Sequence, residues 1–193
     1  MPQARKVTTY TFSELSEEAQ EQVIASYREN FEFDIYQDDI LDNIKEKYPH
    51  IEDMVISYSG FWSQGDGASF TGYLDLDWLL TESGFLTDEQ KELVRDIDCT
   101  FSRRHSRYHH SNTCRTDLEV TEFAEHIQDN DYLIMKLIAP IEEYLQDAVE
   151  DYRQDVCYEV YSALESEYEF LTSHEAIRDW ADDQEFLENG EIF

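Results

Sequence analysis

Five carboxylates recur at every fourth position toward the C-terminal end of the chain: Glu143, Asp147, Asp151, Asp155 and Glu159. On a helix, residues four apart are neighbours about 6 Å from each other, so this spacing predicts one row of negative charge. Like charges at that spacing repel by roughly 0.2–0.5 kcal/mol per pair. A helix that needed only solubility would interleave Lys or Arg. Such a row of carboxylates can act electrostatically. It can bind a basic surface that otherwise binds phosphate groups.

The segment 140–171 must carry this row, and its composition is typical of a helix. It contains no Gly, and its single Pro is the first residue, a position that a helix tolerates. Arg153 is its only cation. A second line of residues at spacings of three and four is apolar and predicts a buried stripe: Ile141, Leu145, Ala148, Tyr152, Val156, Val160, Ala163 and Leu164. We therefore expect a long acidic C-terminal helix that packs through this stripe.

The density of charge on this helix limits what it can imitate. Residues 142–169 contain ten acids over 28 residues, which corresponds to about 42 Å of helix and one charge per roughly 4 Å. One DNA strand carries a charge per about 3.4 Å, and the duplex one per about 1.7 Å. The helix approximates one strand, so a duplex copy needs a second subunit or a second acidic row from Glu32, Asp34, Asp38, Asp39 and Asp42. The alternative is that the row is only a solvated face.

Composition excludes several classes of protein. The 193 residues have a net charge of −31, which repels nucleic acid and anionic membranes, so we expect neither to be a direct partner. The length and the 41% hydrophobic share predict one folded domain, 1–193. Three cysteines are typical of a reducing cytoplasm, and no stretch has the length of a leader or a membrane span. We expect a cytoplasmic protein.

The remaining pattern predicts an α+β fold, an antiparallel sheet of hairpins covered by helices. Strands are expected at 7–12, 54–61 and 68–74, a polar hairpin at 100–120 with Ser111-Asn112 near its turn, and a small hairpin at 186–193. Ser16 and Ser173 are expected to cap helices, as is Thr87. A helix over 131–139 leads into Pro140, which either kinks one long helix or starts a new one.

The turn between the strands at 54–61 and 68–74 contains a candidate binding group. Trp62, Gln64 and Asp66 could present an aromatic face and two polar groups to a partner. Turn geometry is a sufficient explanation for the glycines and Asp66, and we favour a tight hairpin in which Trp62 packs in the core.

The segment 99–118 is a basic island between two acidic blocks, with four arginines and one aspartate. It has the residue types of a zinc site, but its spacings do not match the usual pairs of close ligands, so we predict no metal and no cofactor. We expect its arginines to pair with the protein's own acids, or with the acidic face of a second copy in a homodimer. A nucleotide or nucleic-acid contact with stacking on Phe101 and Tyr108 is the alternative.

The run SGFWSQGDGASF at 59–70 resembles a motif of small uncharacterised bacteriophage accessory proteins. The LSEEA start at 15–19 and the ending with Phe186 and Asn189-Gly190 resemble the same group. The resemblance touches about half of the chain and implies a phage origin without an activity. By charge and helix pattern, the chain is also similar to phage-encoded DNA mimics, which occupy the DNA-binding grooves of restriction, CRISPR or recombination enzymes.

These observations predict a non-enzymatic, phage-encoded inhibitor that mimics nucleic-acid charge. Its partner is a basic nucleic-acid-binding protein of host defence or DNA processing, in the host-cell cytoplasm. The predicted contacts are the carboxylate row, Trp62 and Asp66. The motifs HExxH, GxSxG and GxxxxGK[ST] are absent. The alternatives are an antitoxin-like interaction module for a basic partner, or a small metal- or nucleotide-binding protein.

Overall fold

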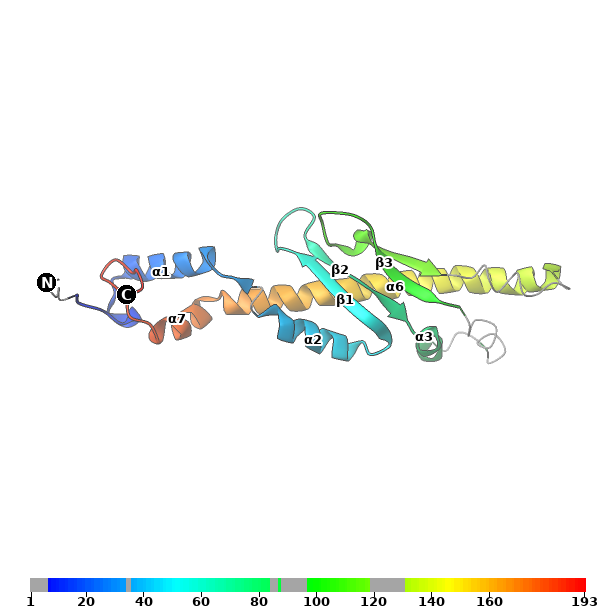
Figure 1. Ribbon diagram of the computed structural model, residues 1–193, viewed down its shortest axis with the longest axis horizontal. Helices are drawn as coiled ribbons and strands as arrows, with labels where there is room; N and C mark the ends of the chain where they lie inside the picture. The colour runs from blue at the N-terminus through cyan, green and yellow to red at the C-terminus, as the bar shows by residue number, and fades with distance from the viewer. Residues whose placement is uncertain (1–6, 34–35, 84–86, 88–96, 119–130) are drawn as a thin grey trace, which may run out of the picture. The chain divides into compact units, whose positions relative to one another are not determined.

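The computed structural model describes residues 7–33, 36–83, 87, 97–118 and 131–193 (Figure 1). The chain divides into two compact units, one formed by 1–38 and 164–193 and the other by 39–163. The single domain that the sequence predicts over 1–193 stays a prediction. Among the described residues, none of the helices combines the length and the apolar character needed to cross a membrane.

The unit 39–163 contains a four-stranded antiparallel sheet. Its strands follow chain order, β1 (Ile51–Ser59), β2 (Gly67–Leu74), β3 (Cys99–Arg103) and β4 (Cys114–Leu118). The helices α2 (Gln37–Lys47) and α3 (Leu76–Ser83) flank the hairpin β1–β2 in sequence. The predicted α+β class is confirmed, as are the hairpins and the long acidic helix.

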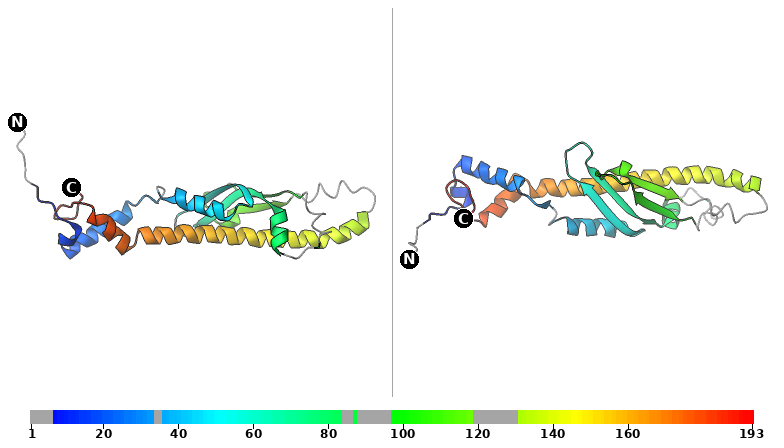
Figure 2. Two further views of the ribbon diagram at one scale, coloured as in Figure 1. Left: turned by 90° about the horizontal axis from the view of Figure 1, so that it is seen from below. Right: turned by 45° about the horizontal axis from the view of Figure 1, so that its top comes forward.

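The helix α6 (Asp131–Leu171) lies along one face of this sheet (Figure 2). It continues through Pro140 without a break, so this proline neither starts nor ends a helix. Leu145, Val149 and Val156 are fully buried on the inner side of α6, and the rings of Phe70 and Phe101 meet edge to face at 4.8 Å. The predicted apolar stripe is confirmed, with Val149 rather than Ala148 at its centre.

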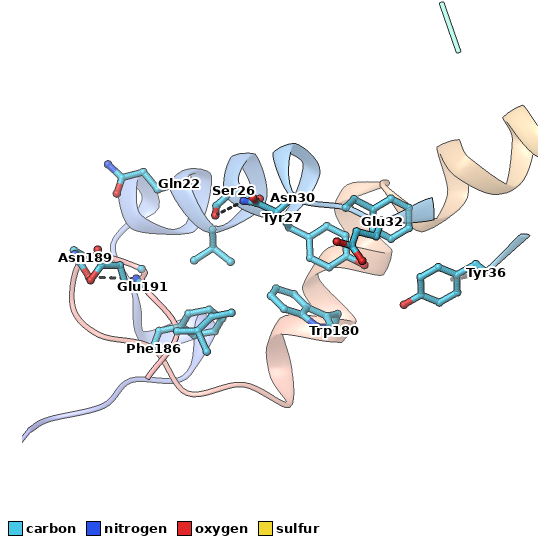
Figure 3. Close-up of a pocket in the computed structure, with 14 residues that line it drawn as sticks. Gln22, Ser26, Tyr27, Asn30, Glu32, Tyr36, Trp180, Phe186, Asn189 and Glu191 are labelled. Carbon is cyan, nitrogen blue, oxygen red and sulfur yellow. Dashed lines mark hydrogen bonds between the residues drawn. The ribbon is translucent and has the colours of Figure 1, made fainter. Parts of the chain in front are cut away.

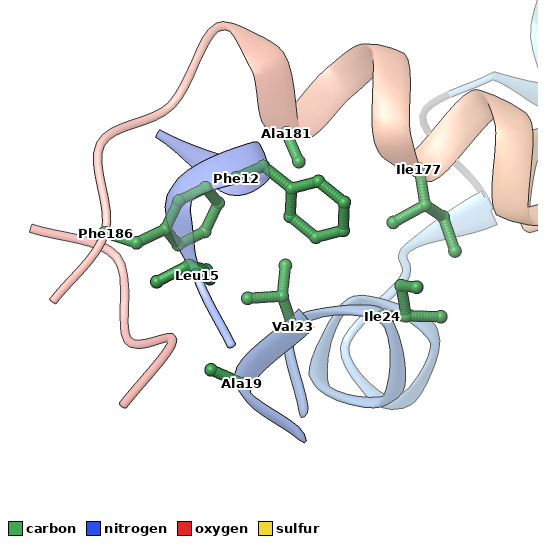
Figure 4. Close-up of a cluster of buried hydrophobic side chains, with 8 residues drawn as sticks. All are labelled: Phe12, Leu15, Ala19, Val23, Ile24, Ile177, Ala181 and Phe186. Carbon is green, nitrogen blue, oxygen red and sulfur yellow. The ribbon is translucent and has the colours of Figure 1, made fainter. Parts of the chain in front are cut away.

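The other unit has its own apolar core (Figure 4). The unit contains the 3₁₀ turn η1 (Phe12–Glu14), the helix α1 (Glu17–Glu29), the C-terminal end of α6 and the helix α7 (His174–Asp182). The core side chains are Phe12, Leu15, Ala19, Val23, Ile24, Ile177, Ala181 and Phe186.

Local signals place the helix starts of this unit correctly. The hydroxyl of Ser16 accepts the N–H of Ala19 at 3.2 Å, and that of Ser173 accepts the N–H of Ala176 at 3.2 Å. Both hydroxyls satisfy backbone donors that a helix start leaves unpaired. The predicted cap at Thr87 depends on residues 88–90, which lie outside the described part of the chain.

The strand predicted at 7–12 is wrong. Tyr10 makes one isolated bridge to Phe186, and the chain then enters the 3₁₀ turn at Phe12. A single bridge pairs too few residues to form a strand. The predicted turn at the C-terminus is confirmed: Leu187 donates its N–H to Glu191 at 2.7 Å, and Gly190 supplies the positive φ of 86° that the turn needs.

Candidate functional site

All five carboxylates of the row on α6 are exposed, and four of them are unpaired among the described residues. Glu143, Asp147, Asp151 and Asp155 make no hydrogen bond or ion pair with any residue that the structure describes. Glu159 differs, because it accepts hydrogen bonds from the ammonium of Lys47 and the hydroxyl of Tyr48. The free row therefore ends at Asp155.

Helix geometry explains why the fifth carboxylate behaves differently. A four-residue step on a helix of about 3.6 residues per turn advances the side chain by about 40°, so five positions sweep roughly 160° around the axis. The row crosses the outer face of α6 obliquely instead of running straight along it. Glu143 lies at one edge of that face, and Glu159 reaches the other edge, where Lys47 and Tyr48 contact it.

The outer face of α6 carries no positive charge between residues 143 and 158. Arg153 is the only cation in that range, and its side chain is 3% exposed and points inward. Neutral side chains complete the face, among them Gln154 and Tyr158, which is 71% exposed. Four carboxylates and the exposed tyrosine that follows them form what we call the acidic face: Glu143, Asp147, Asp151, Asp155 and Tyr158.

The buried guanidinium of Arg153 forms hydrogen bonds with groups of its own unit. Nε of Arg153 donates to Glu150 at 3.0 Å, Nη2 donates to the second oxygen of the same carboxylate, and Nη1 donates to the backbone oxygen of Ser111. The guanidinium beside it lowers the pKa of Glu150. This cluster fixes the loop before β4 to the inner side of α6, which leaves the acidic face uncompensated.

A second cluster ties the start of β1 to α6, and sequence reasoning missed it. The ring of His50 stacks on Trp78 at 3.4 Å with an interplanar angle of 9°, and its Nε2 shares a hydrogen bond with the hydroxyl of Tyr152. Burial lowers the pKa of His50. No spacing in the sequence links these three residues, because their elements meet only in the fold.

The pair Tyr48–Glu159 belongs to the same contact between α2 and α6. Hydrogen bonds from Lys47 and then from Tyr48 lower the pKa of Glu159. Burial, and then the Glu159 carboxylate, raise the pKa of Tyr48. Glu159 therefore holds two elements together and belongs to the packing of the unit, not to its free charge.

The exposed acids of α2 do not form a second uncompensated acidic row, because lysines lie among them. Asp39, Asp42 and Glu46 are exposed there, but Lys45 pairs with Asp42 at 3.2 Å and Lys47 with Glu159. Of the other acids considered for that row, Glu32 and Asp38 belong to the other compact unit, and Asp34 lies outside the described residues. The described charge therefore corresponds to one strand of phosphates at most.

The motif at 59–70 and the basic island lie against each other, a contact that the sequence did not predict (Figure 1). A Cβ at Gly65 would be 2.9 Å from the ring of Tyr108, and one at Gly67 would be 2.6 Å from Cβ of His110. The hydroxyl of Ser59 accepts the N–H of His109 at 3.2 Å. Close approach of the two loops, in addition to turn geometry, explains the glycines.

The two residues singled out in that motif have different environments. Trp62 is 62% exposed and has a φ of +66°, so the expectation that it packs in the core is wrong. The carboxylate of Asp66 accepts the N–H of Ser63 at 2.6 Å and closes the turn. The turn explains Asp66, while a partner contact by Trp62 stays a prediction.

The basic island forms the hairpin β3–β4, but in a different register from the predicted one. Arg103 pairs with Cys114 and Cys99 with Leu118, because the loop covers 104–113 and includes the 3₁₀ turn η3 (Ser111–Thr113). A two-residue turn at Ser111-Asn112 is therefore wrong. Cys99 and Cys114 lie at opposite ends of this hairpin, and both are buried free thiols.

Within the described ranges, the arginines of the island do not form the expected ion pairs with acids of the same chain, and pairing with a second copy stays a prediction. In the described part of the chain, no ion pair involves Arg103, Arg104, Arg107 or Arg115. Arg103 donates to the hydroxyl of Ser57 at 3.0 Å, and the guanidinium of Arg107 lies 4.6 Å from the ring centre of Tyr108. Among the described residues, no group of three or more His, Cys, Asp or Glu could hold a metal ion.

Comparison with known proteins identifies a family without an assigned activity. The family model described as "Domain of unknown function (DUF8835)" matches residues 29–174, which include β1 to β4 and all of α6. The chain therefore belongs to this family. No curated protein and no solved structure matches it.

Proposed function

We propose that this member of the DUF8835 family is a non-catalytic protein that binds a basic, nucleic-acid-binding partner through the acidic face of α6. The observation that carries the proposal is the arrangement of four exposed carboxylates with no cation among them, while the one nearby cation, Arg153, is buried. Neighbouring like charges repel, and these four carboxylates make three such neighbouring pairs in a row. A partner that supplies positive charge relieves that repulsion on binding.

The partner's groove accommodates one strand of phosphates. The acidic face is a single oblique row, and Glu159 is held by Lys47 and Tyr48. A site for single-stranded nucleic acid, or one side of a duplex groove, matches this charge better than a whole duplex. Tyr158, at the C-terminal end of the face, supplies an aromatic contact of the kind that often contributes most of an interface's binding energy.

A role as a phage inhibitor of a host defence or DNA-processing protein is part of this proposal. The resemblance of residues 59–70 to phage accessory proteins supports it, as does the overall charge of −31. Long-range attraction between the acidic chain and a basic groove makes association fast and strongly dependent on salt.

The test compares three forms of the chain as bait in a bacterial lysate. The ladder variant is Asp147→Asn, Asp151→Asn and Asp155→Asn, and the control variant is Glu52→Gln, Glu185→Gln and Glu188→Gln. Both remove three exposed charges, so they differ only in position. The wild type and the control variant should retain the same basic partner at low salt, and the ladder variant should lose it. Equal retention by all three forms would contradict the proposal.

A second candidate function is binding of a phosphate-bearing ligand at a polar pocket of about 540 Å³ beside β4. Arg104 and Arg115 line it with the buried Arg153, and neither has a carboxylate partner among the described residues. Unpaired guanidinium groups in so acidic a chain favour an anion there. Binding of a nucleotide that Arg104→Gln with Arg115→Gln abolishes, and the ladder variant leaves intact, would support this candidate instead.

A further inference from the structure

An aromatic pocket of about 600 Å³ lies in the unit formed by 1–38 and 164–193, and its lining includes none of the residues predicted from the sequence to bind a partner (Figure 3). Tyr27, Phe31 and Tyr36 line it as a stack, with ring centres 5.4 and 5.6 Å apart. Trp180 from α7 closes the series, with its ring centre 4.6 Å from that of Tyr27. Four aromatic rings, three from the stretch 27–36 and one from α7, thus line one pocket.

The charged residues that line the pocket are all acidic. Its lining includes the carboxylates of Glu32 and Glu191 and contains no Lys, Arg or His. Figure 3 shows the Glu32 carboxylate between Trp180 and Tyr36. Among the described residues, Glu32 makes no hydrogen bond or ion pair, so its oxygens are available to a ligand.

Aromatic faces together with a carboxylate are the groups that recognise an organic cation. A cation near a ring face is attracted by the ring quadrupole, and a guanidinium is planar, so it stacks on a ring while its N–H groups donate to a carboxylate. An ammonium is compact and strongly hydrated, and it gains less from a stack of rings. The pocket therefore favours arginine over lysine.

The size of the pocket favours a side chain that is part of a polypeptide. Its volume is in the range of pockets that hold whole small ligands, about 300–1,000 Å³, and exceeds what one guanidinium fills. Tyr36 is 46% exposed, so the rim is open to an attached chain. The amide of Asn30 donates to the Ser26 oxygen, and that of Asn189 accepts the N–H of Glu191, so the amide oxygen of Asn30 and the amide nitrogen of Asn189 are the groups left for a peptide backbone.

We propose that this pocket binds an arginine side chain of a basic polypeptide, stacked on the aromatic rings and paired with Glu32. The inference rests on the pocket alone and does not depend on the acidic face of α6. It assigns a binding role to the unit that does not contain that face.

The test is an NMR titration of the isotope-labelled full-length chain, with the indole N–H signal of Trp180 as the reporter. The probe is an end-blocked Gly-Arg-Gly tripeptide. Its matched control is the citrulline tripeptide, which keeps the shape and removes the charge. The arginine peptide should shift the Trp180 signal, and the citrulline peptide should bind at least about tenfold more weakly. Equal binding of the two peptides would overturn the proposal.

Two variants locate the contact, and a third controls for overall charge. Glu32→Gln and Tyr36→Leu should each weaken binding of the arginine peptide by at least about threefold. Glu29→Gln removes the same charge three residues away, outside the pocket, and should leave binding within about twofold of the wild type. The amide spectrum of each variant reports whether it folds. Unchanged affinity in folded Glu32→Gln would overturn the proposal, and so would tighter binding of spermidine than of the peptide.

Discussion

At the scale of single residues, the position of Arg153 decides what kind of surface α6 presents. The chain has 45 acids and 14 basic residues, so a cation on the outer face would have several carboxylates to neutralise. Arg153 instead lies inside, held by Glu150 and by the backbone oxygen of Ser111. Burial of this one side chain leaves the four carboxylates of the face without a cation among them.

The two members of this pair should respond differently to truncation. Arg153 is 3% exposed, whereas the side chain of Glu150 is 39% exposed. Glu150→Ala leaves a buried guanidinium without its carboxylate and should cost about 3 kcal/mol, while Arg153→Met leaves a carboxylate that water can reach and should cost about 1–2 kcal/mol. Urea unfolding of both variants measures the difference, and a larger loss in Arg153→Met would contradict this account of the pair.

At the scale of elements, one side of α6 packs in the core and the other side carries exposed negative charge. Its inner side carries Leu145, Val149 and Val156 against the sheet, and its outer side carries the four free carboxylates. Packing supplies the stability of the helix, because the row of like charges works against it. A helix selected for stability alone would not keep that row.

Neutralising the row should therefore stabilise the protein. The ladder variant removes the repulsion from four neighbouring pairs between Glu143 and Glu159, each worth about 0.2–0.5 kcal/mol, so it should gain about 1 kcal/mol at low salt. Asn and Asp have similar helix propensities, so the exchange itself is nearly neutral. Urea unfolding should place its midpoint above those of the wild type and the control variant. A lower midpoint would mean that the carboxylates support the fold.

The elements that the sequence predicted correctly are those with local signals. Ser16 and Ser173 cap helices through residues three positions away, and the glycines at 65 and 67 mark the turn before β2. The period of the apolar stripe on α6 identified its buried side because every helix of that length repeats in the same way.

The features that were missed depend on contacts between distant segments. The backbone of Tyr10 pairs with that of Phe186, which is far away in the sequence. The residues 7–12 alone therefore do not indicate that this pairing is a single bridge and not a strand. Trp62 was expected in the core because aromatic residues usually are, but the positive φ at the turn points it outward. The spacing of the carboxylate row was visible in the sequence. The ion pair between Glu159 and Lys47 could not be predicted, because it depends on where α2 packs against α6.

At the scale of the whole molecule, the net charge opposes folding through self-repulsion, and salt screens that repulsion. A net charge of −31 on 193 residues raises the energy of the compact state relative to the unfolded chain. Salt at moderate concentration shortens the range of that repulsion to about 10 Å or less.

The melting temperature should accordingly rise between 20 and 200 mM sodium chloride, concentrations chosen to bracket a Debye length of about 10 Å. The few ion pairs among the described residues, such as Lys45–Asp42, are exposed and contribute little that salt could remove. Differential scanning calorimetry measures this effect. A melting temperature that falls steadily over the same range would show that attractive pairs outweigh the net repulsion.

The most direct test of the central claim is competition between the chain and nucleic acid for the same partner. The partner captured from lysate is loaded with a fluorescent single-stranded oligonucleotide, and fluorescence anisotropy follows its displacement. The wild type and the control variant should displace it completely, and the ladder variant should need at least about tenfold more protein, equivalent to about 1.4 kcal/mol. Simultaneous binding of the chain and the oligonucleotide, or equal displacement by the ladder variant, would contradict the claim that the acidic face of α6 stands in for phosphates.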